Sequence, residues 1–149
     1  MTDIGNGMCE VTLKIEGTTT RVHEMFDISD CIPTGARFFE SKSHPYYSTD
    51  GGKIYRSVCL WEKSNGNISG YASVYNGNIN NSNDGTYVET CPEYSFSMEV
   101  SYVIRAAAEG EFVSPGALLE NRLTNTASVS EKYTVQTLPS GAWKISASD

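Results

Sequence analysis

The chain contains four cysteines, namely Cys9, Cys31, Cys59 and Cys91. They are widely spaced and form no C-x-x-C pair, which a catalytic dithiol or a local zinc knuckle would need. Neither His23 nor His44 is spaced from a cysteine as zinc ligands usually are. An even number of cysteines in a chain of low charge favours an exported protein with two disulfides, in any of three pairings. The alternative is four buried free thiols in a cytosolic protein.

The two histidines are the other candidates for catalysis. Neither lies near a nucleophile motif such as G-x-S-x-G, so a surface or partly packed position is the better interpretation of both. Most glycines belong to turn signals and not to a phosphate-binding loop between a strand and a helix. We therefore expect no enzyme activity, no catalytic residue, no metal site and no cofactor.

The segment from Asn76 to Asp84 is rich in acidic and amide side chains, and this composition predicts a long exposed loop. The run from Asn81 to Gly85 resembles the spacing of oxygen ligands in a calcium loop. An EF-hand needs a bidentate glutamate further along, and Glu89 lies too close to supply it. The pattern therefore favours a loop that binds no calcium.

A lysine in the first predicted strand, Lys14, raises the possibility of an intramolecular isopeptide bond to a late asparagine. Such bonds occur in surface domains of Gram-positive bacteria. The late strand that we expect over 128–138 contains no Asn or Asp, although Asn121 and Asn125 lie just before it. An intact mass without loss of ammonia would reject this hypothesis.

Aromatic residues offer a possible interaction surface, for which the candidates are Tyr46, Tyr47, Tyr71 and Tyr75. Together with Trp61, Trp143, Tyr55 and Tyr87 they could form a carbohydrate platform or a protein contact patch. The alternative, which the pattern favours, is that most of these rings pack in the core or at the edges of a β-sandwich.

The composition excludes several classes of protein. Of 149 residues, 39% are hydrophobic, 11% aromatic and only 19% charged, which is too apolar for a disordered chain. The net charge of −7 argues against nucleic-acid or anionic-membrane binding, because both need basic patches. No apolar run is long enough to cross a bilayer, so we expect no membrane insertion.

Period-two alternation and turn residues dominate the sequence. Strands are predicted over 9–15, 21–28, 54–61, 68–75, 94–107, 111–113 and 128–138, and one short helix over 116–123. Glycine-containing turns such as Asn65-Gly66 and Asn76-Gly77 separate the strands. The fold class is therefore all-β: an antiparallel β-sandwich of about seven to nine strands, macroglobulin-like or immunoglobulin-like.

The longest run, 94–107, predicts the central strand of this sandwich. Its apolar face consists of Phe96, Met98, Val100, Tyr102 and Ile104, and the opposite face includes Val103. We expect the apolar face to contact a second set of buried side chains: Val11, Leu13, Val22, Phe26, Val58 and Val135. The prediction is one domain over 1–149, with a core over about 8–137 and a tail over 138–149.

Two segments resemble a known family. Residues 27–38 end a strand with D-x-I-P-x-G-x-R-F, and residues 100–117 read Y-x-I-R-A-x-x-x-G-x-F followed by P-G-A. This pair, with 68–75 between them, is similar to the C-terminal region of bacterial alpha-2-macroglobulin-like proteins over about 8–137.

The resemblance implies a non-catalytic C-terminal β-sandwich module of a large protease-trapping surface protein. Such a module packs against other domains of the same polypeptide and shields the thioester region, and host or microbial proteases are partners of the full-length protein. Cys9-Glu10-Val11 is not the C-x-E-Q thioester motif. The implied location is extracellular or at the cell surface, or periplasmic. Because the start lacks the basic and apolar regions of a signal peptide, we expect a piece excised from a larger protein.

An alternative resemblance shares part of this pattern. Repeat modules of bacterial surface adhesins also combine a D-x-(I/L)-P-x-G strand with a later Y-x-(V/I)-(K/R) strand, and they act as structural spacers or ligand binders. The continuation from Gly110 to Ala117 favours the macroglobulin interpretation.

Overall fold

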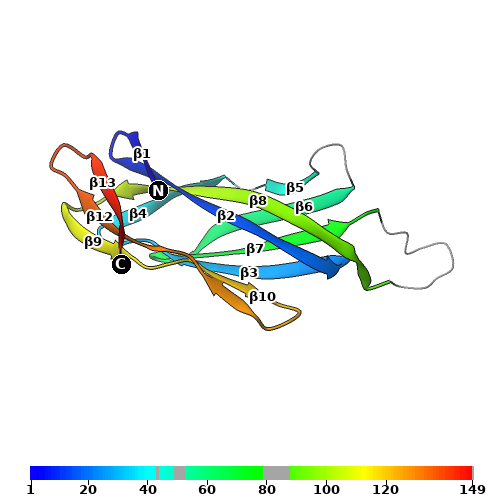
Figure 1. Cartoon of the computed structure of the whole chain (residues 1–149). Coiled ribbons are helices and arrows are strands. Elements are labelled where there is room, and N and C mark those ends of the chain that lie inside the picture. Colours follow the sequence, from blue (N-terminus) through cyan, green and yellow to red (C-terminus); the bar gives the residue numbers. More distant parts are fainter. Residues whose placement is uncertain (43, 49–52, 79–87, 149) are drawn as a thin grey trace.

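The computed structural model describes residues 1–42, 44–48, 53–78 and 88–148. The described residues form antiparallel strands in three sheets and no helix (Figure 1). This architecture confirms the predicted all-β sandwich. The number of strands in the described residues is thirteen, which is larger than the predicted seven to nine because several short edge strands and a third sheet are added to the two main layers.

Sheet A is the first main layer, in the order β1-β2-β8-β4. Its strands are β1 (Thr2–Gly5), β2 (Met8–Arg21), β8 (Thr90–Ala106) and β4 (Ala36–Lys42). The two long strands pair over most of their length, from Met8 opposite Arg105 to Thr19 opposite Tyr94. The predicted strand 94–107 is therefore an interior strand of this sheet, as expected from its alternation.

Sheet B is the second main layer, in the order β11-β10-β3-β7-β6-β5. Its strands are β11 (Ala127–Val129), β10 (Leu118–Asn121), β3 (His23–Cys31), β7 (Asn67–Asn76), β6 (Ile54–Ser64) and β5 (His44–Ser48). The hairpin of β6 and β7 turns at Gly66, whose φ of 83° lies in the left-handed region that glycine tolerates best. Strand β3 pairs along the other side of β7, from His23 opposite Tyr75 to Cys31 opposite Asn67.

A small sheet C closes the end of the sandwich where the two chain termini lie (Figure 1). It contains β13 (Trp143–Ser148), β12 (Lys132–Thr137) and β9 (Gly110–Ser114) in the order β13-β12-β9. Trp143 is buried, and its indole N–H donates to the carbonyl of Gly7 at 3.0 Å. The predicted tail over 138–149 is wrong for 143–148, because these residues form β13 and pair with β12.

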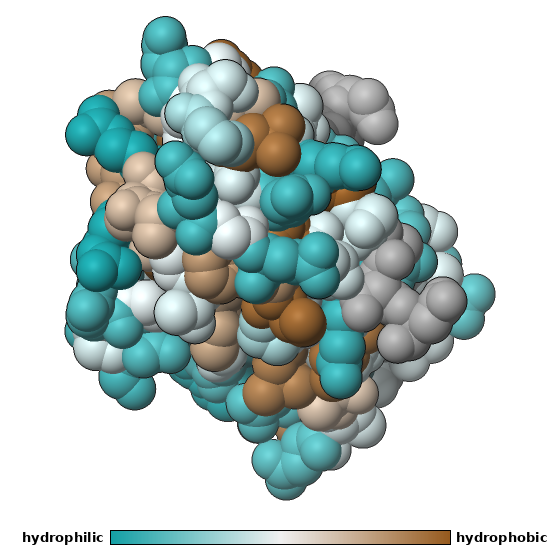
Figure 2. Space-filling view, turned by 90° about the vertical axis from the view of Figure 1, so that its left-hand side faces the viewer, coloured by the Kyte–Doolittle hydropathy of each residue, from teal (hydrophilic) through white to brown (hydrophobic). Residues whose placement is uncertain are grey.

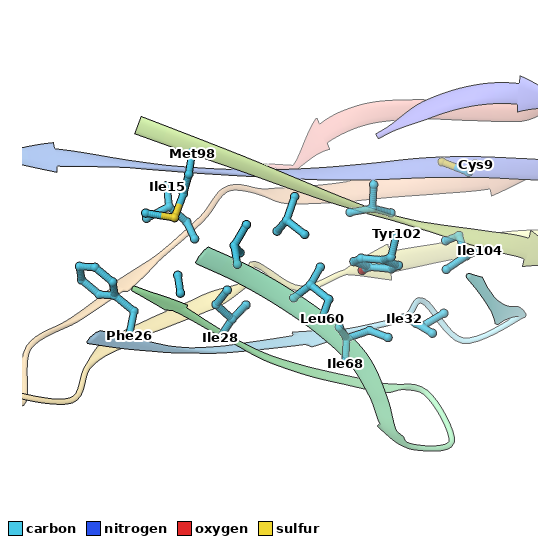
Figure 3. Close-up of a cluster of buried hydrophobic side chains, with 14 of the residues drawn as sticks. Cys9, Ile15, Phe26, Ile28, Ile32, Leu60, Ile68, Met98, Tyr102 and Ile104 are labelled. Atoms are coloured by element: carbon cyan, nitrogen blue, oxygen red, sulfur yellow. The ribbon is translucent and has the colours of Figure 1, made fainter. Parts of the chain in front are cut away.

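The core lies between sheets A and B. Figure 3 shows side chains of β2 and β8, among them Ile15, Met98 and Ile104, directed toward side chains of sheet B such as Phe26 and Ile28. All five residues of the predicted apolar face of β8 are buried. The partners expected for that face are buried as well, except Leu13, which is partly buried against the same cluster: Val11, Val22, Phe26, Val58 and Val135. Val103 is also buried, although its position in the alternation predicted an outward side chain.

Two local predictions were wrong. The segment 116–123 is not a helix, because Leu118–Asn121 forms strand β10, which pairs with β3 on one side and β11 on the other. The expected strand over 128–138 is divided between β11 and β12, which belong to different sheets. Gly116 allows the chain before β10 to pass close to the chain after β11, because a Cβ at position 116 would lie only 2.2 Å from the carbonyl oxygen of Ser130.

Candidate interaction surface

The outward side of sheet B combines aromatic rings with serines. Strand registers place the outward side chains of β6, β7 and β3 in four rows: Tyr55, Tyr75 and His23; Ser57, Ser73 and Met25; Cys59, Tyr71 and Asp27; Trp61, Ser69 and Ser29. The alternate residues of these strands face the core, which leaves these rows on the outer face. We call this set of side chains the aromatic face.

The first row is held by contacts between its rings. Tyr55 stacks beside Tyr75, with 6.3 Å between the ring centroids and 22° between the ring planes. His23 contacts the other side of Tyr75 edge-on, at 6.1 Å and 89°. Aromatic pairs in such geometries are mutually attractive, so the three rings form one ordered group. The Tyr75 residue nevertheless keeps 37% of its surface exposed.

A second aromatic pair lies further along the same strands. The Trp61 and Tyr71 rings have centroids 6.2 Å apart and planes at 53°, and the two residues are 45% and 38% exposed. The Cys59 thiol donates to the Tyr71 hydroxyl at 3.5 Å. The pKa of the Tyr71 hydroxyl is raised, chiefly by its hydrogen bond with Cys59. This phenol is therefore neutral at physiological pH and presents an uncharged polar edge to a partner.

An ion pair borders the aromatic face on the β10 side. Arg122 donates to both carboxylate oxygens of Asp27, at 2.5 Å and 3.3 Å. The hydrogen bond from Arg122 lowers the pKa of Asp27. Both side chains are about half exposed, so the pair contributes little to stability and is available to polar groups of a partner.

The predicted interaction tyrosines are only partly placed by the structure. Tyr71 and Tyr75 both lie on the outer face of β7, where they belong to the aromatic face. Tyr46 and Tyr47 belong to β5, which pairs with β6 through Tyr47 opposite Arg56. Their side chains lie outside the residues whose side chains the structure describes.

The remaining aromatic candidates lie in different environments. Trp61 is one of the more exposed aromatic residues of the structure, whereas Trp143 is buried in sheet C. Tyr87 lies outside the described residues. Each strand of the aromatic face alternates outward and inward side chains, but the sequence does not show that the strands are neighbours. Because β3, β7 and β6 lie side by side, their odd-numbered residues share one face of the sheet.

The expectation of two disulfides is not met, because the structure records four free cysteines. Cys9 is buried in β2, and burial raises the pKa of its thiol to about 11. Two others interact with asparagine side chains in different parts of the fold: Cys31 with Asn67, and Cys91 with Asn76. Cys59 contacts Tyr71 on the aromatic face. The cysteines thus occupy separate environments, which their even number in the sequence could not reveal.

The structure also bears on the hypotheses of an isopeptide bond, a calcium loop, a metal site and a membrane span. Lys14 is exposed and pairs with Glu16 at 3.5 Å, whereas Asn121 donates to the buried Glu24 at 2.6 Å, so the structure gives Lys14 and Asn121 different partners. Residues 79–84 of the calcium-like loop lie outside the described part of the chain. Among described residues no group of three or more potential metal-ligating side chains is found. Nor does that part of the chain include a helix able to cross a membrane.

A lateral cavity of about 330 Å³ lies beside β2, between that strand and residues 114–119 and 128–133. The carboxylate of Asp30 lines it and accepts hydrogen bonds from the Tyr102 hydroxyl at 2.6 Å and the Cys31 amide at 2.9 Å. Burial raises the pKa of Asp30. The hydrogen bond joins the two main layers, since Asp30 belongs to β3 and Tyr102 to β8.

The comparisons with known proteins identify no relative. No protein-family model, no curated protein and no solved structure matches this chain.

Proposed function

We propose that this chain is a non-catalytic β-sandwich module that acts by contact, through the aromatic face of sheet B. Following the resemblance in the sequence, we assign it as a C-terminal module of a large alpha-2-macroglobulin-like protease-trapping protein at the bacterial cell surface. Its partners are then other domains of the same polypeptide, and it shields the thioester region.

One observation supports the choice of surface: three aromatic residues on two adjacent strands, Trp61, Tyr71 and Tyr75, each expose more than a third of their area. Tryptophan and tyrosine are enriched among the residues that dominate binding energy in protein interfaces, because they bury a large area and keep a polar group for hydrogen bonding. Exposed rings on one sheet face are therefore suited to a protein partner.

The rest of the face suits a flat contact. Serines occupy positions between the rings, so the backbone of a partner can approach the sheet closely between Tyr75 and Tyr71. The Asp27–Arg122 pair supplies charge at the border and not at the centre. A partly apolar centre with polar groups around it is the usual arrangement of a protein interface.

The experiment compares hydrogen exchange in the isolated chain and in the full-length polypeptide of its gene. We expect additional protection in β6 and β7 of the full-length protein. The variant Trp61→Ala/Tyr71→Ala should strongly reduce that additional protection, because it removes two of the three exposed rings without removing core residues. Phe39→Ala is the matched control, since Phe39 is 45% exposed on strand β4 of the other sheet.

Equal exchange of β6 and β7 in the two proteins would contradict the assigned surface. A gene that encodes tandem copies of this module before a wall-anchor signal, without a C-x-E-Q motif, would contradict the macroglobulin assignment and favour the adhesin interpretation. The two results are independent, so the surface and the family are tested separately.

A further inference from the structure

We propose that the outer edge of β2 pairs with the same edge of a second copy of this chain, so that two copies of sheet A join into one continuous antiparallel sheet. This contact is separate from the aromatic face, because it uses the edge of the other sheet. It depends neither on the proposed function nor on the macroglobulin assignment.

The free part of this edge is long. Strand β1 pairs with β2 only as far as Glu10, and the pairing with β8 shifts register between Thr19 and Arg21. From Val11 to Thr19, β2 pairs with β8 on one side, and no strand of the described part of the chain pairs with its other side. Such an edge presents a row of backbone N–H and C=O groups that can form a ladder with another strand.

Other edges of the main sheets carry features that prevent pairing. Strand β4 shifts register between Phe38 and Glu40, and β5 contains Pro45 together with a register shift. Strand β11 has only three residues. Bulges, prolines, short length and charged side chains are features by which sheet edges avoid association. The free part of β2 has only the last of these, Lys14 and Glu16, and its two charges have opposite signs.

The free stretch fixes a symmetric register, because the middle of Val11–Thr19 is Ile15. When two copies pair antiparallel about this point, Lys14 lies opposite the partner's Glu16, and symmetry repeats the pair. Thr12 then lies opposite the partner's Thr18. Lys14 and Glu16 are both on the outer face, with side chains 55% and 65% exposed, and they pair with each other at 3.5 Å within the chain. Because this ion pair is exposed and therefore weak, each charge can also interact with the opposite charge of the partner.

Neighbouring registers are disfavoured by the same two charges. Pairing centred on residue 14 would place Lys14 opposite the partner's Lys14, and pairing centred on residue 16 would place Glu16 opposite the partner's Glu16. Like charges directly opposite one another destabilise a strand pair. The register set by the length of the free edge is thus also the one in which opposite charges meet.

The inner side of the edge can also accept a second copy. The lateral cavity separates β2 from residues 128–131, and side chains of Val11, Leu13 and Ile15 line it. In the proposed register Leu13 lies opposite the partner's Gly17, which has no side chain to compete for this space. A second strand at the edge would cover the opening with its own inward side chains.

The test is sedimentation velocity of the purified chain from micromolar to near-millimolar concentration. We expect a concentration-dependent dimer for the wild type. Lys14→Glu and Glu16→Lys each turn two attractive pairs into two repulsive ones, and each should weaken dimerisation by about tenfold to a hundredfold. The double variant Lys14→Glu/Glu16→Lys restores opposite charges across the edge and should recover the wild-type dimer. Lys144→Glu, an exposed charge reversal in sheet C, is the matched control.

Register is tested by mixing the variants Thr12→Cys and Thr18→Cys under oxidising conditions and mapping disulfides by mass spectrometry. A link between positions 12 and 18 of different copies is expected. A chain that remains monomeric at all concentrations overturns the proposal. So does a dimer that responds equally to Lys144→Glu, that is not recovered by the double variant, or that gives no such link.

Discussion

The two outer faces of this sandwich cover the same core and are built differently. On sheet A the outward residues of β2 and β8 are mostly charged or hydroxyl-bearing, and they interact with one another: Lys14 with Glu16, and Thr12 with Ser101. On sheet B the outward residues of β6 and β7 are tyrosine, tryptophan and serine, and the contacts are between rings. Figure 2 shows the end of the molecule that carries sheet C, where hydrophobic groups occur in small areas between hydrophilic ones.

This difference indicates separate roles for the two sheets. A charged face remains solvated, and its pairs contribute little energy, because water competes for each group. An aromatic face exposes area whose burial is favourable, so it gains when a partner covers it. In sheet A the potential for association lies at the edge of β2, and in sheet B it lies on the face.

The largest loss of stability is expected from a substitution in the core that both sheets cover. Ile104 of β8 is fully buried, and Ile104→Asp would place a carboxylate among apolar side chains. Loss of the buried side chain costs about 1.5–3 kcal/mol, and burial of an unpaired charge adds several more. We expect the variant to be unfolded by circular dichroism and thermal melting. Ser97→Asp, on the outward side of the same strand, should leave the melting temperature nearly unchanged. Equal stability of the two variants would show that the assigned sides of β8 are wrong.

A smaller effect distinguishes the two outer faces directly. Tyr75 contacts two rings, and each aromatic pair contributes about 0.5–1.5 kcal/mol, so Tyr75→Ala should lower the unfolding free energy by about 1–3 kcal/mol. On sheet A, Phe39 lies 5.3 Å below the Arg105 guanidinium, a contact of about 0.5–1 kcal/mol at an exposed site. Urea denaturation should therefore find Tyr75→Ala the less stable variant. The reverse order would mean that the rings of the aromatic face are not packed as a group.

The alternation of β8 illustrates what sequence can predict. Five apolar residues at period two in 94–107 identify an interior strand and its buried side, because a one-residue slip would turn every one of them toward water. Period-two alternation also predicts the approximate positions of β2, β3, β6 and β7. Local pattern was sufficient there, since each strand carries its own periodicity.

Other elements depend on neighbours that local pattern does not show. Leu118–Asn121 is a strand because Leu119 pairs beside Ile28 of β3, far away in the sequence. Trp143 is buried because sheet C brings it to Gly7. The aromatic face follows the same rule: its rows exist only when β3, β7 and β6 lie side by side, so the sequence showed the tyrosines but not which of them share a surface.

The buried carboxylate between the layers predicts a pH effect. Because the pKa of Asp30 in the folded protein is raised above its ordinary value of 3.8, the folded state binds this proton more tightly than the unfolded state. Its contribution to stability is therefore fully present at pH below 3.8 and is lost as pH rises through the folded pKa. Asp30→Asn should remove this contribution to the pH dependence. The hydrogen-exchange rates of sheets A and B should be the same in the variant as in the wild type. The measurement is the difference in unfolding free energy between variant and wild type across this pH range. A difference that does not vary with pH would contradict the assigned ionisation.

The smallest effect concerns the border of the aromatic face, where Arg122 lowers the pKa of Asp27. The pH dependence expected for Asp27 is opposite to that of Asp30. The stabilisation that Asp27 provides is present above pH 3.8 and is lost as pH falls through the lowered pKa of the folded protein. Both groups are exposed, so water and salt screen the pair, and Arg122→Ala should shift the thermal melting temperature only slightly at low ionic strength. In high salt the shift should disappear. If the pair serves recognition, the same variant should reduce the additional protection of β7 in the full-length protein by more than it changes stability. A large loss of stability with no change in protection would instead make the ion pair a structural feature of sheet B and restrict the contact surface to its rings.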